Sequence, residues 1–234
     1  MKLARVLSAL GRTMITAGVL ILLFVAYQLW GTGLHTSRAQ DDAFDDLEAQ
    51  AEVSGVDIDE PAPEDLRPSR RRQRVPNPPE RGGPVGVVEI PSIGLRWVFF
   101  EGVGLDVLEN GPGHYEGTPL PGEPGNAGIA GHRTTYGAPF HRLDEVREGD
   151  RIIVSYAIGS RFIYEYQRTD IVTPDRVDVL HRRQRDSLTL TACHPKYSAA
   201  ERIVVTGVLL DRPARPRPQT EAEVAEPPPT LEEA

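Results

Sequence analysis

The middle of the chain, residues 84–211, consists of short apolar segments separated by turns rich in glycine and proline. In SLTLTAC (187–193), polar and apolar residues alternate, which is typical of a strand with one buried face. The segments RIIVSYA and RFIYEYQR, joined across residues 158–160, predict a β-hairpin. We expect strands at 85–90, 95–102, 126–132, 151–157, 161–168, 187–193 and 202–210.

Few helices are expected between these strands. Residues 105–110 are followed by a glycine and can form one or two helical turns, and residues 138–146 and 173–180 are candidates for short helices. Seven or eight short strands with one or two short helices predict a mainly β fold that closes, or nearly closes, into a barrel. A segment of this length can bury a core without disulfide bonds.

The N-terminal pattern differs from the rest. Residues 13–30 (TMITAGVLILLFVAYQLW) carry no charge, which predicts a transmembrane helix and a lipid bilayer as partner. Basic residues in segment 1–12 place that segment in the cytoplasm and the rest outside, as a single-pass protein of the cell membrane. A cleaved signal peptide is the alternative, but the apolar run is long for one and no Ala-x-Ala site follows.

Two polar segments flank the predicted barrel. Residues 39–66 contain many Asp and Glu but no Lys or Arg, and residues 67–81 combine Arg with Pro. Like charges repel and proline interrupts helices, so we expect 31–83 to be a disordered tether, with a transient helix around 44–53 at most. Residues 212–234 are expected to form a second disordered tail.

The charge balance excludes one class of partner. The chain has 26 Lys and Arg against 34 Asp and Glu, a net charge of −8, and both signs are spread along it. No segment has the basic surplus of a nucleic-acid-binding protein, so we expect no nucleic acid partner. Cys193 is the only cysteine, which excludes an intramolecular disulfide and a metal site built from several cysteines.

Cys193 is the strongest candidate for chemistry. The alternation places it on the same face as Thr191 and opposite Leu190, so the thiol faces a groove or solvent if the leucine faces the core. A buried structural cysteine is the alternative. A catalytic thiol would need a group that carries protons and a cation for the oxyanion.

Candidates for both groups are present. His132 ends a strand of small residues, where a loop can expose its imidazole, and His141 follows on the next loop. Arg202 opens the strand after that of Cys193, so antiparallel pairing would bring the two together. Arg133 is the competing cation.

These residues together resemble one family. Residues 189–193 (TLTAC) are similar to the Thr-Leu-x-Thr-Cys signature of sortases, and the upstream His132 and downstream Arg202 complete that family's His–Cys–Arg set in the same chain order. Residues 111–146 resemble class E sortases of actinobacteria most, although class D enzymes share much of this pattern. The resemblance implies an eight-stranded sortase-type β-barrel over 84–211, tied to an N-terminal membrane helix.

The resemblance also implies an activity and its residues. Cys193 would attack the Thr–Gly bond of a C-terminal sorting motif, His132 would transfer protons, and Arg202 would hold the oxyanion. Tyr115 and Thr191 would contact the substrate. The implied partners are surface proteins bearing that motif and the amine of a peptidoglycan precursor. No cofactor or metal is implied, and whether the motif is LAxTG or LPxTG stays open.

Two other classes of cysteine enzyme do not fit the sequence around Cys193. An L,D-transpeptidase would carry Ser-His-Gly-Cys at the nucleophile, and a papain-like protease would place its Cys before its His, and neither applies to Cys193. The remaining alternative is a catalytically silent, membrane-anchored β-barrel binding module with a structural thiol. Reactivity of Cys193 toward an alkylating agent would distinguish the two.

Overall fold

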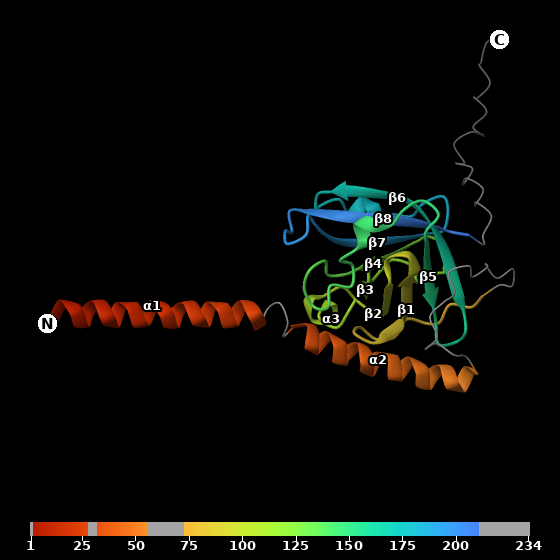
Figure 1. The fold of residues 1–234 in the computed structure, drawn as a ribbon. Coiled ribbons are helices and arrows are strands. Elements are labelled where there is room, and N and C mark those ends of the chain that lie inside the picture. The colour runs from red at the N-terminus through yellow and green to blue at the C-terminus, as the bar shows by residue number, and fades with distance from the viewer. Residues whose placement is uncertain (1, 28–31, 56–72, 211–234) are drawn as a thin grey trace, which may run out of the picture.

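The computed structural model describes residues 2–27, 32–55 and 73–210 (Figure 1). Within these ranges the strands form a closed barrel in the order β1-β2-β3-β4-β7-β8-β6-β5, which confirms the predicted fold class. The strands are β1 Pro84–Ile90, β2 Leu95–Glu101, β3 Gly113–His114, β4 Asn126–Ala130, β5 Arg151–Ser155, β6 Arg161–Val172, β7 Ser187–His194 and β8 Glu201–Leu209.

Helical segments are short within the barrel and long before it. The helices are α1 Lys2–Ala26, α2 Thr32–Ser54 and α3 Leu105–Leu108, with 3-10 turns at η2 Pro91–Ile93, η3 Leu143–Glu145 and η4 Val177–Leu180. Two of the expected helices, 138–146 and 173–180, therefore reduce to single 3-10 turns. The two-residue strand β3 was not predicted, because two residues carry no periodicity.

Apolar side chains from all the longer strands fill the interior of the barrel. β4 contributes Ile129, β7 contributes Leu188 and Leu190, and β8 contributes Ile203 and Val205, all within 1% of complete burial. On β7, Ser187, Thr189 and Thr191 alternate with the leucines and lie on the opposite face, where they are buried as well. The outer face of this wall is therefore covered along most of β7 and becomes partly accessible at Cys193.

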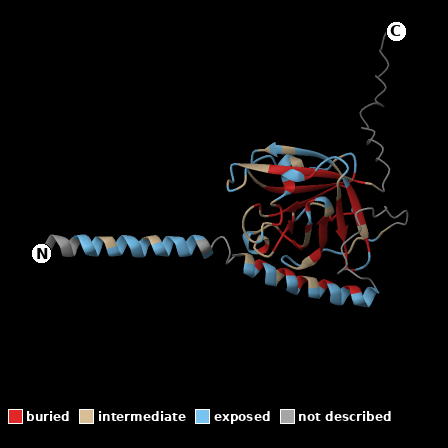
Figure 2. Cartoon of the chain, viewed as in Figure 1, coloured by how far each residue is buried: buried red, intermediate tan, exposed pale blue. Residues whose placement is uncertain are grey.

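Helix α2 corrects one expectation. Residues 31–83 were expected to be a disordered tether, yet residues 32–54 form a helix against β1 and β2 (Figure 1). Ala43, Leu47 and Ala51, spaced four residues apart, are buried on the side of α2 that faces the barrel (Figure 2). This apolar stripe is narrow and surrounded by acidic residues, so the acidic composition of the segment predicted disorder instead of a docked helix.

Polar contacts seat α2 as well. The Gln40 side chain bridges the edge of β2: its Oε1 accepts from the Val98 N–H at 2.8 Å and its Nε2 donates to the Val98 carbonyl at 3.0 Å. Thr36 donates to the carbonyl of Glu109 at 2.8 Å. Residues 56–72 and 211–234 lie outside the described residues, so the expected disorder of these parts stays a prediction.

Helix α1 contains residues 13–26 of the predicted membrane segment 13–30, and residues 28–30 of that segment lie outside the described residues. Residues Leu7–Val25 are long and apolar enough to cross a bilayer, and none of this window is buried inside the structure. We expected the apolar stretch to begin at residue 13, but the window that can cross a bilayer begins earlier, at Leu7. Helix α1 ends at Ala26. Such a helix fits a single-pass membrane anchor, and a signal sequence passes the same test.

Candidate active site

Cys193 lies near the C-terminal end of β7, directly across from Arg202 of β8 in the antiparallel register. Leu188 and Leu190 of the same strand pack in the barrel core. Because side chains alternate along a strand, Cys193 lies on the outer face. Its side chain is free of disulfide bonding and only partly buried. The structure therefore places the thiol at the rim of the barrel, outside the core.

His132 reaches the same rim from the neighbouring strand. β4 and β7 pair in parallel, with Ala130 across from Thr191, and the Gly131 N–H extends the pairing by donating to the Thr191 carbonyl at 3.0 Å. His132 and Cys193 each lie two residues beyond that last pair. Continuing the register therefore brings both side chains to the same end and the same face of adjacent strands.

The His132 imidazole is partly enclosed. Its Nε2 is buried and has no hydrogen-bond partner among the residues that the structure describes. The ring packs against Tyr136, with centroids 4.9 Å apart and planes tilted by 32°. Burial lowers the pKa of His132 below its usual range, and the nearby carboxylate of Glu109 opposes this in part. The resting imidazole is therefore mainly neutral at neutral pH and can accept a proton.

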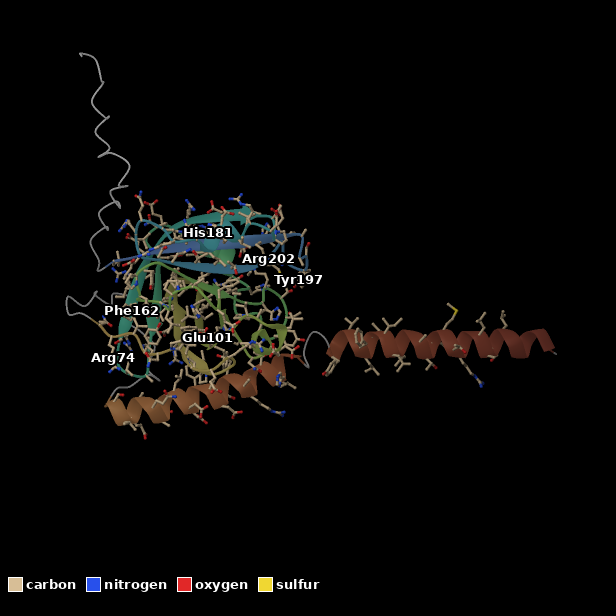
Figure 3. All side chains as sticks on the ribbon, turned by 180° about the vertical axis from the view of Figure 1, so that it is seen from behind. Arg74, Glu101, Phe162, His181, Tyr197 and Arg202 are labelled. Carbon is tan, nitrogen blue, oxygen red and sulfur yellow. The ribbon has the colours of Figure 1, made fainter. Side chains whose placement is uncertain are left out.

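Arg202 is held at the site by the β7–β8 loop. Its Nη1 donates to the carbonyls of Ala199 at 3.0 Å and Glu201 at 2.9 Å, which fixes the guanidinium beside its own strand. Figure 3 shows Arg202 at the end of the barrel where Tyr197 of this loop also lies. Because an arginine stays charged at physiological pH, this side chain brings a permanent positive charge next to the Cys193 position.

Arg133, the competing cation, is committed elsewhere. Its side chain is buried, its Nη2 pairs with Asp144 at 2.8 Å, and its Nε donates to the His141 carbonyl at 2.9 Å. His141 in turn donates from Nδ1 to the Arg133 carbonyl at 3.0 Å. These contacts hold the loop after His132 in place. The Nη1 of Arg133 is buried without a hydrogen-bond partner among the described residues, whereas the strand register places Arg202 across from Cys193.

The other histidines of the barrel have structural surroundings. His114 is buried between Glu101, 2.9 Å from its Nδ1, and Thr118, 3.0 Å from its Nε2. His181 is exposed and accepts from Asn126 through its backbone carbonyl. His194 follows Cys193 on the strand and therefore faces the opposite way. Only His132 among them continues a strand that pairs directly with β7.

Tyr115 and Thr191, both expected to contact substrate, contact each other. The Tyr115 hydroxyl lies 2.9 Å from Oγ1 of Thr191, two residues before Cys193. Thr118 positions the tyrosine by donating to the Tyr115 carbonyl at 2.8 Å while accepting from the Gly128 N–H at 3.1 Å. A Cβ added at Gly128 would lie 2.8 Å from the Tyr115 ring, so the absence of a side chain at Gly128 leaves room for the tyrosine.

Asn126 is a residue that sequence reasoning missed. Its Oδ1 accepts from Ser187 at 3.0 Å and Thr189 at 2.8 Å on β7, and its Nδ2 donates to the carbonyls of Val179 at 2.9 Å and His181 at 3.2 Å. All four groups of a buried amide are thereby used. Asn126 thus fastens the segment between β6 and β7 to the outer face that carries Cys193. Only its position at a strand start could have hinted at this.

The arrangement suits covalent acyl transfer. The strand registers bring Cys193, His132 and Arg202 to one end of β4, β7 and β8. A thiol, an imidazole and a guanidinium are the kinds of group that such chemistry uses as nucleophile, proton carrier and oxyanion partner. In the described parts of the chain, no group of three or more His, Cys, Asp or Glu side chains is placed to hold a metal ion.

Comparison with known proteins identifies the family. A family model described as a sortase domain matches residues 88–210. Sortase SrtE1 of Streptomyces coelicolor is 30% identical over 233 residues, covering 93% of this chain and 61% of that protein, so the chain spans about three-fifths of this relative.

Solved structures agree. The sortase E structure from Streptomyces avermitilis is 33% identical with a TM-score of 0.51, over 55% of this chain and 89% of that chain. A Clostridium perfringens sortase D5 transpeptidase is 26% identical with a TM-score of 0.55, over 74% of this chain and 97% of that chain. The expected likeness to class E is thereby confirmed. Because the family model matches more than half of this chain, the chain belongs to the sortase family.

Proposed function

We propose that the protein is a membrane-anchored, extracytoplasmic cysteine transpeptidase. It cleaves a C-terminal sorting motif between Thr and Gly and joins the new carboxyl end to an amine of a cell-wall precursor. The observation that carries this proposal is the strand register: Cys193 lies across from Arg202, and continuing the β4–β7 pairing by two residues brings His132 to the same end. A sortase domain over residues 88–210 supports the same activity.

The first half-reaction forms a thioacyl enzyme. The Cys193 sulfur, as thiolate, attacks the carbonyl carbon of the motif threonine, and the C–N bond to glycine breaks after a tetrahedral intermediate. The proton that the thiol loses resides on His132, which gives it to the departing glycine amine. The low pKa of His132 that burial produces makes the imidazolium a ready proton donor.

The second half-reaction reverses these roles. The amine of the wall precursor attacks the thioacyl carbonyl, His132 accepts the proton of that amine, and the Cys193 sulfur leaves. The product is a new amide bond, with no net oxidation or reduction. In both halves the oxyanion lies toward Arg202, whose positive charge stabilises it. Hydrogen bonds to two backbone carbonyls already hold the guanidinium in place, so it does not have to reorganise during the reaction.

The substrate runs along the outer face beside β7. Tyr115 and Thr191 form one polar contact two residues before Cys193, which supports a role for this pair beside the motif residues that precede the scissile bond. We propose that this pair contacts the second residue of the motif and so discriminates between LAxTG and LPxTG. Helix α1 anchors the protein in the bilayer through Leu7–Val25, with its N-terminal end on the cytoplasmic side and the barrel outside.

Mass spectrometry tests the activity directly. The full chain, in detergent micelles, is incubated with LAxTG and LPxTG peptides and a small amine. We expect an acyl adduct on the enzyme and a peptide–amine product, both absent in Cys193→Ala, and a product lost in His132→Ala. Alkylation of Cys193 without any adduct or product would contradict transpeptidation. A Cys193 that resists alkylation in the folded protein would favour the silent binding module with a structural thiol.

A further inference from the structure

The catalytic-site histidine is packed against a tyrosine that is itself held by a carboxylate. Tyr136 stacks on His132 with ring centroids 4.9 Å apart, and its hydroxyl donates to Oε1 of Glu109 at 3.0 Å. Tyr136 lies in the loop after β4, whereas Glu109 follows α3, so two loops from different parts of the barrel meet over the imidazole.

The backbone around Tyr136 is strained in a way that serves this contact. Tyr136, Gly137 and Ala138 have φ values of 51°, 70° and 49°, so three successive residues adopt the left-handed conformation. This conformation is sterically disfavoured for residues other than glycine. A side chain at Gly137 would also place a Cβ 2.5 Å from the Trp97 ring.

Neighbouring contacts hold this turn against its strain. The Phe140 N–H donates to the His132 carbonyl at 3.1 Å, and the Ala138 N–H donates to the Thr135 carbonyl at 2.8 Å. The turn therefore folds the chain back toward His132 and carries the Tyr136 ring onto the imidazole. Strained backbone kept in place by its surroundings is characteristic of positions where geometry serves function.

Helix α2 supports the same assembly from the other side. Thr36 donates to the Glu109 carbonyl at 2.8 Å, and Gln40 donates to the Asn110 carbonyl at 2.9 Å. The backbone that carries the Glu109 carboxylate is thus pinned between the barrel and the helix that follows the membrane segment.

Charge acts along this assembly as well. The Glu109 carboxylate raises the pKa of Tyr136, chiefly through their hydrogen bond, so the hydroxyl keeps its proton and remains a donor. The same carboxylate raises the pKa of His132, against the stronger lowering by burial. Glu109 therefore both holds the stacked tyrosine and favours the imidazolium.

We propose that Tyr136 and Glu109 are positioning residues for the proposed transpeptidation: Tyr136 orients the His132 ring toward Cys193, and Glu109 holds Tyr136 in that place. The inference rests on the proposed function for its kinetic consequence, but not for its effect on the histidine. Neither residue needs to touch the substrate. Both act through His132.

Kinetics of the full chain in micelles give the first test. Tyr136→Phe keeps the ring and loses the hydrogen bond, whereas Tyr136→Ala loses both. Because misplacement of a catalytic group by about 1 Å costs roughly 10²-fold, we expect kcat to fall up to ~100-fold in Tyr136→Ala and less in Tyr136→Phe, with KM nearly unchanged. Glu109→Gln, which keeps a hydrogen-bond acceptor, should resemble Tyr136→Phe.

Controls match each change. Tyr166→Phe removes a tyrosine hydroxyl that contacts Thr169 on β6, and Glu148→Gln neutralises an exposed carboxylate in a turn. Both should leave kcat unchanged. Thermal unfolding of every variant identifies any that fails to fold, and Tyr136→Phe and Glu109→Gln keep the test intact if Tyr136→Ala unfolds.

A direct titration of His132 gives the second test. The imidazole resonance, assigned by its loss in His132→Gln, is followed against pH by NMR. The Glu109 carboxylate acts on the charge of the imidazole, and Tyr136 of the same loop packs against its ring. The strand registers bring Cys193 of β7 and Arg202 of β8 to the same end of the barrel. Glu109→Gln should lower the pKa of His132, because it removes the carboxylate that favours the imidazolium.

The two tests separate the two proposals. Unchanged kcat and an unchanged His132 titration in Glu109→Gln and Tyr136→Ala would overturn the positioning role. If the wild-type enzyme forms no acyl adduct, the proposed transpeptidation fails, and the titration still decides whether the pair acts on His132.

Discussion

The Tyr115 hydroxyl and the Thr191 hydroxyl lie 2.9 Å apart and join the loop after β3 to the strand that carries Cys193. The two residues are far apart in sequence, and the contact exists because β4 lies between β3 and β7 in the barrel. Under the proposed function, this polar pair contacts the peptide whose carbonyl reaches the thiol. Its strength and its effect on substrate choice can be measured separately.

Thr191→Val removes one hydroxyl without changing side-chain size, and Tyr115→Phe removes the other. Each substitution should raise KM for the preferred sorting peptide several-fold, with kcat less affected. Each should also bring the kcat/KM values for LAxTG and LPxTG peptides closer together. Because the hydroxyls share one hydrogen bond, worth about 0.5–1.5 kcal/mol, the double variant should lose less than the sum of the single losses. Additive losses, or an unchanged peptide preference in Tyr115→Ala, would remove this pair from substrate recognition.

Substitution of Arg202 should lower activity, whereas substitution of Arg133 should lower stability. Arg202→Ala removes a cation from the site, so we expect turnover to fall roughly 10²–10³-fold, as for other lost oxyanion donors, with thermal stability nearly unchanged. Arg133→Ala leaves the Asp144 carboxylate and the His141 carbonyl without their buried partner, so it should lower the unfolding temperature. Turnover assays and thermal melts on both variants measure this. An Arg133 variant that is fully stable but inactive would reverse the assignment.

The barrel and its central residues could be read from local patterns. Alternation in residues 187–193 set the outward face of Cys193, and the order of strands predicted that Arg202 would come opposite, as the β7–β8 register shows. His132 was one candidate because it ends a predicted strand, but its choice over the other histidines, and that of Arg202 over Arg133, came from the resemblance to sortases. The strands and their faces needed only neighbouring residues and simple strand pairing.

The parts that sequence did not predict depend on distant contacts. Thr36 and Glu109, which form a hydrogen bond, are 73 residues apart in sequence, and Gln40 and Val98 are 58 apart. The sequence of α2 alone does not predict either partner. Tyr136 gains its place from an unusual left-handed turn that no propensity favours. The acidic charge of the 39–66 segment outweighed its narrow apolar stripe, so a docked helix was taken for a tether.

The lowered pKa of His132 has a consequence for stability. The unfolded chain protonates this histidine near its ordinary pKa of 6.5, whereas the folded chain does so only at lower pH, because burial disfavours the imidazolium. Below about 6.5 the unfolded state therefore binds more protons, and the His132 contribution to stability falls as the pH drops toward the folded pKa. Above that range the contribution is constant.

His132→Gln removes this titration while leaving the carboxylates of the protein in place. The unfolding temperature of His132→Gln relative to wild type should therefore rise as the pH is lowered from 8 to about 5. Thermal melts of both full chains in the same micelles measure the difference, which cancels the other groups that titrate in this range. A difference that stays constant, or changes in the opposite direction, would contradict the burial of the imidazole.

Helix α2 should behave as part of the folded unit. Leu47 is 2% exposed and packs with Val87 and Val98 of the barrel, whereas Leu34 on the same helix is 64% exposed. Leu→Ala costs little helix propensity at either position, so packing alone distinguishes them. Leu47→Ala should therefore lose about 2–5 kcal/mol of unfolding free energy, and Leu34→Ala almost none, as measured by denaturant titration. Equal stabilities would mean that residues 32–54 do not hold to the barrel in solution, and the link from α2 through Glu109 to His132 would then lose its physical basis.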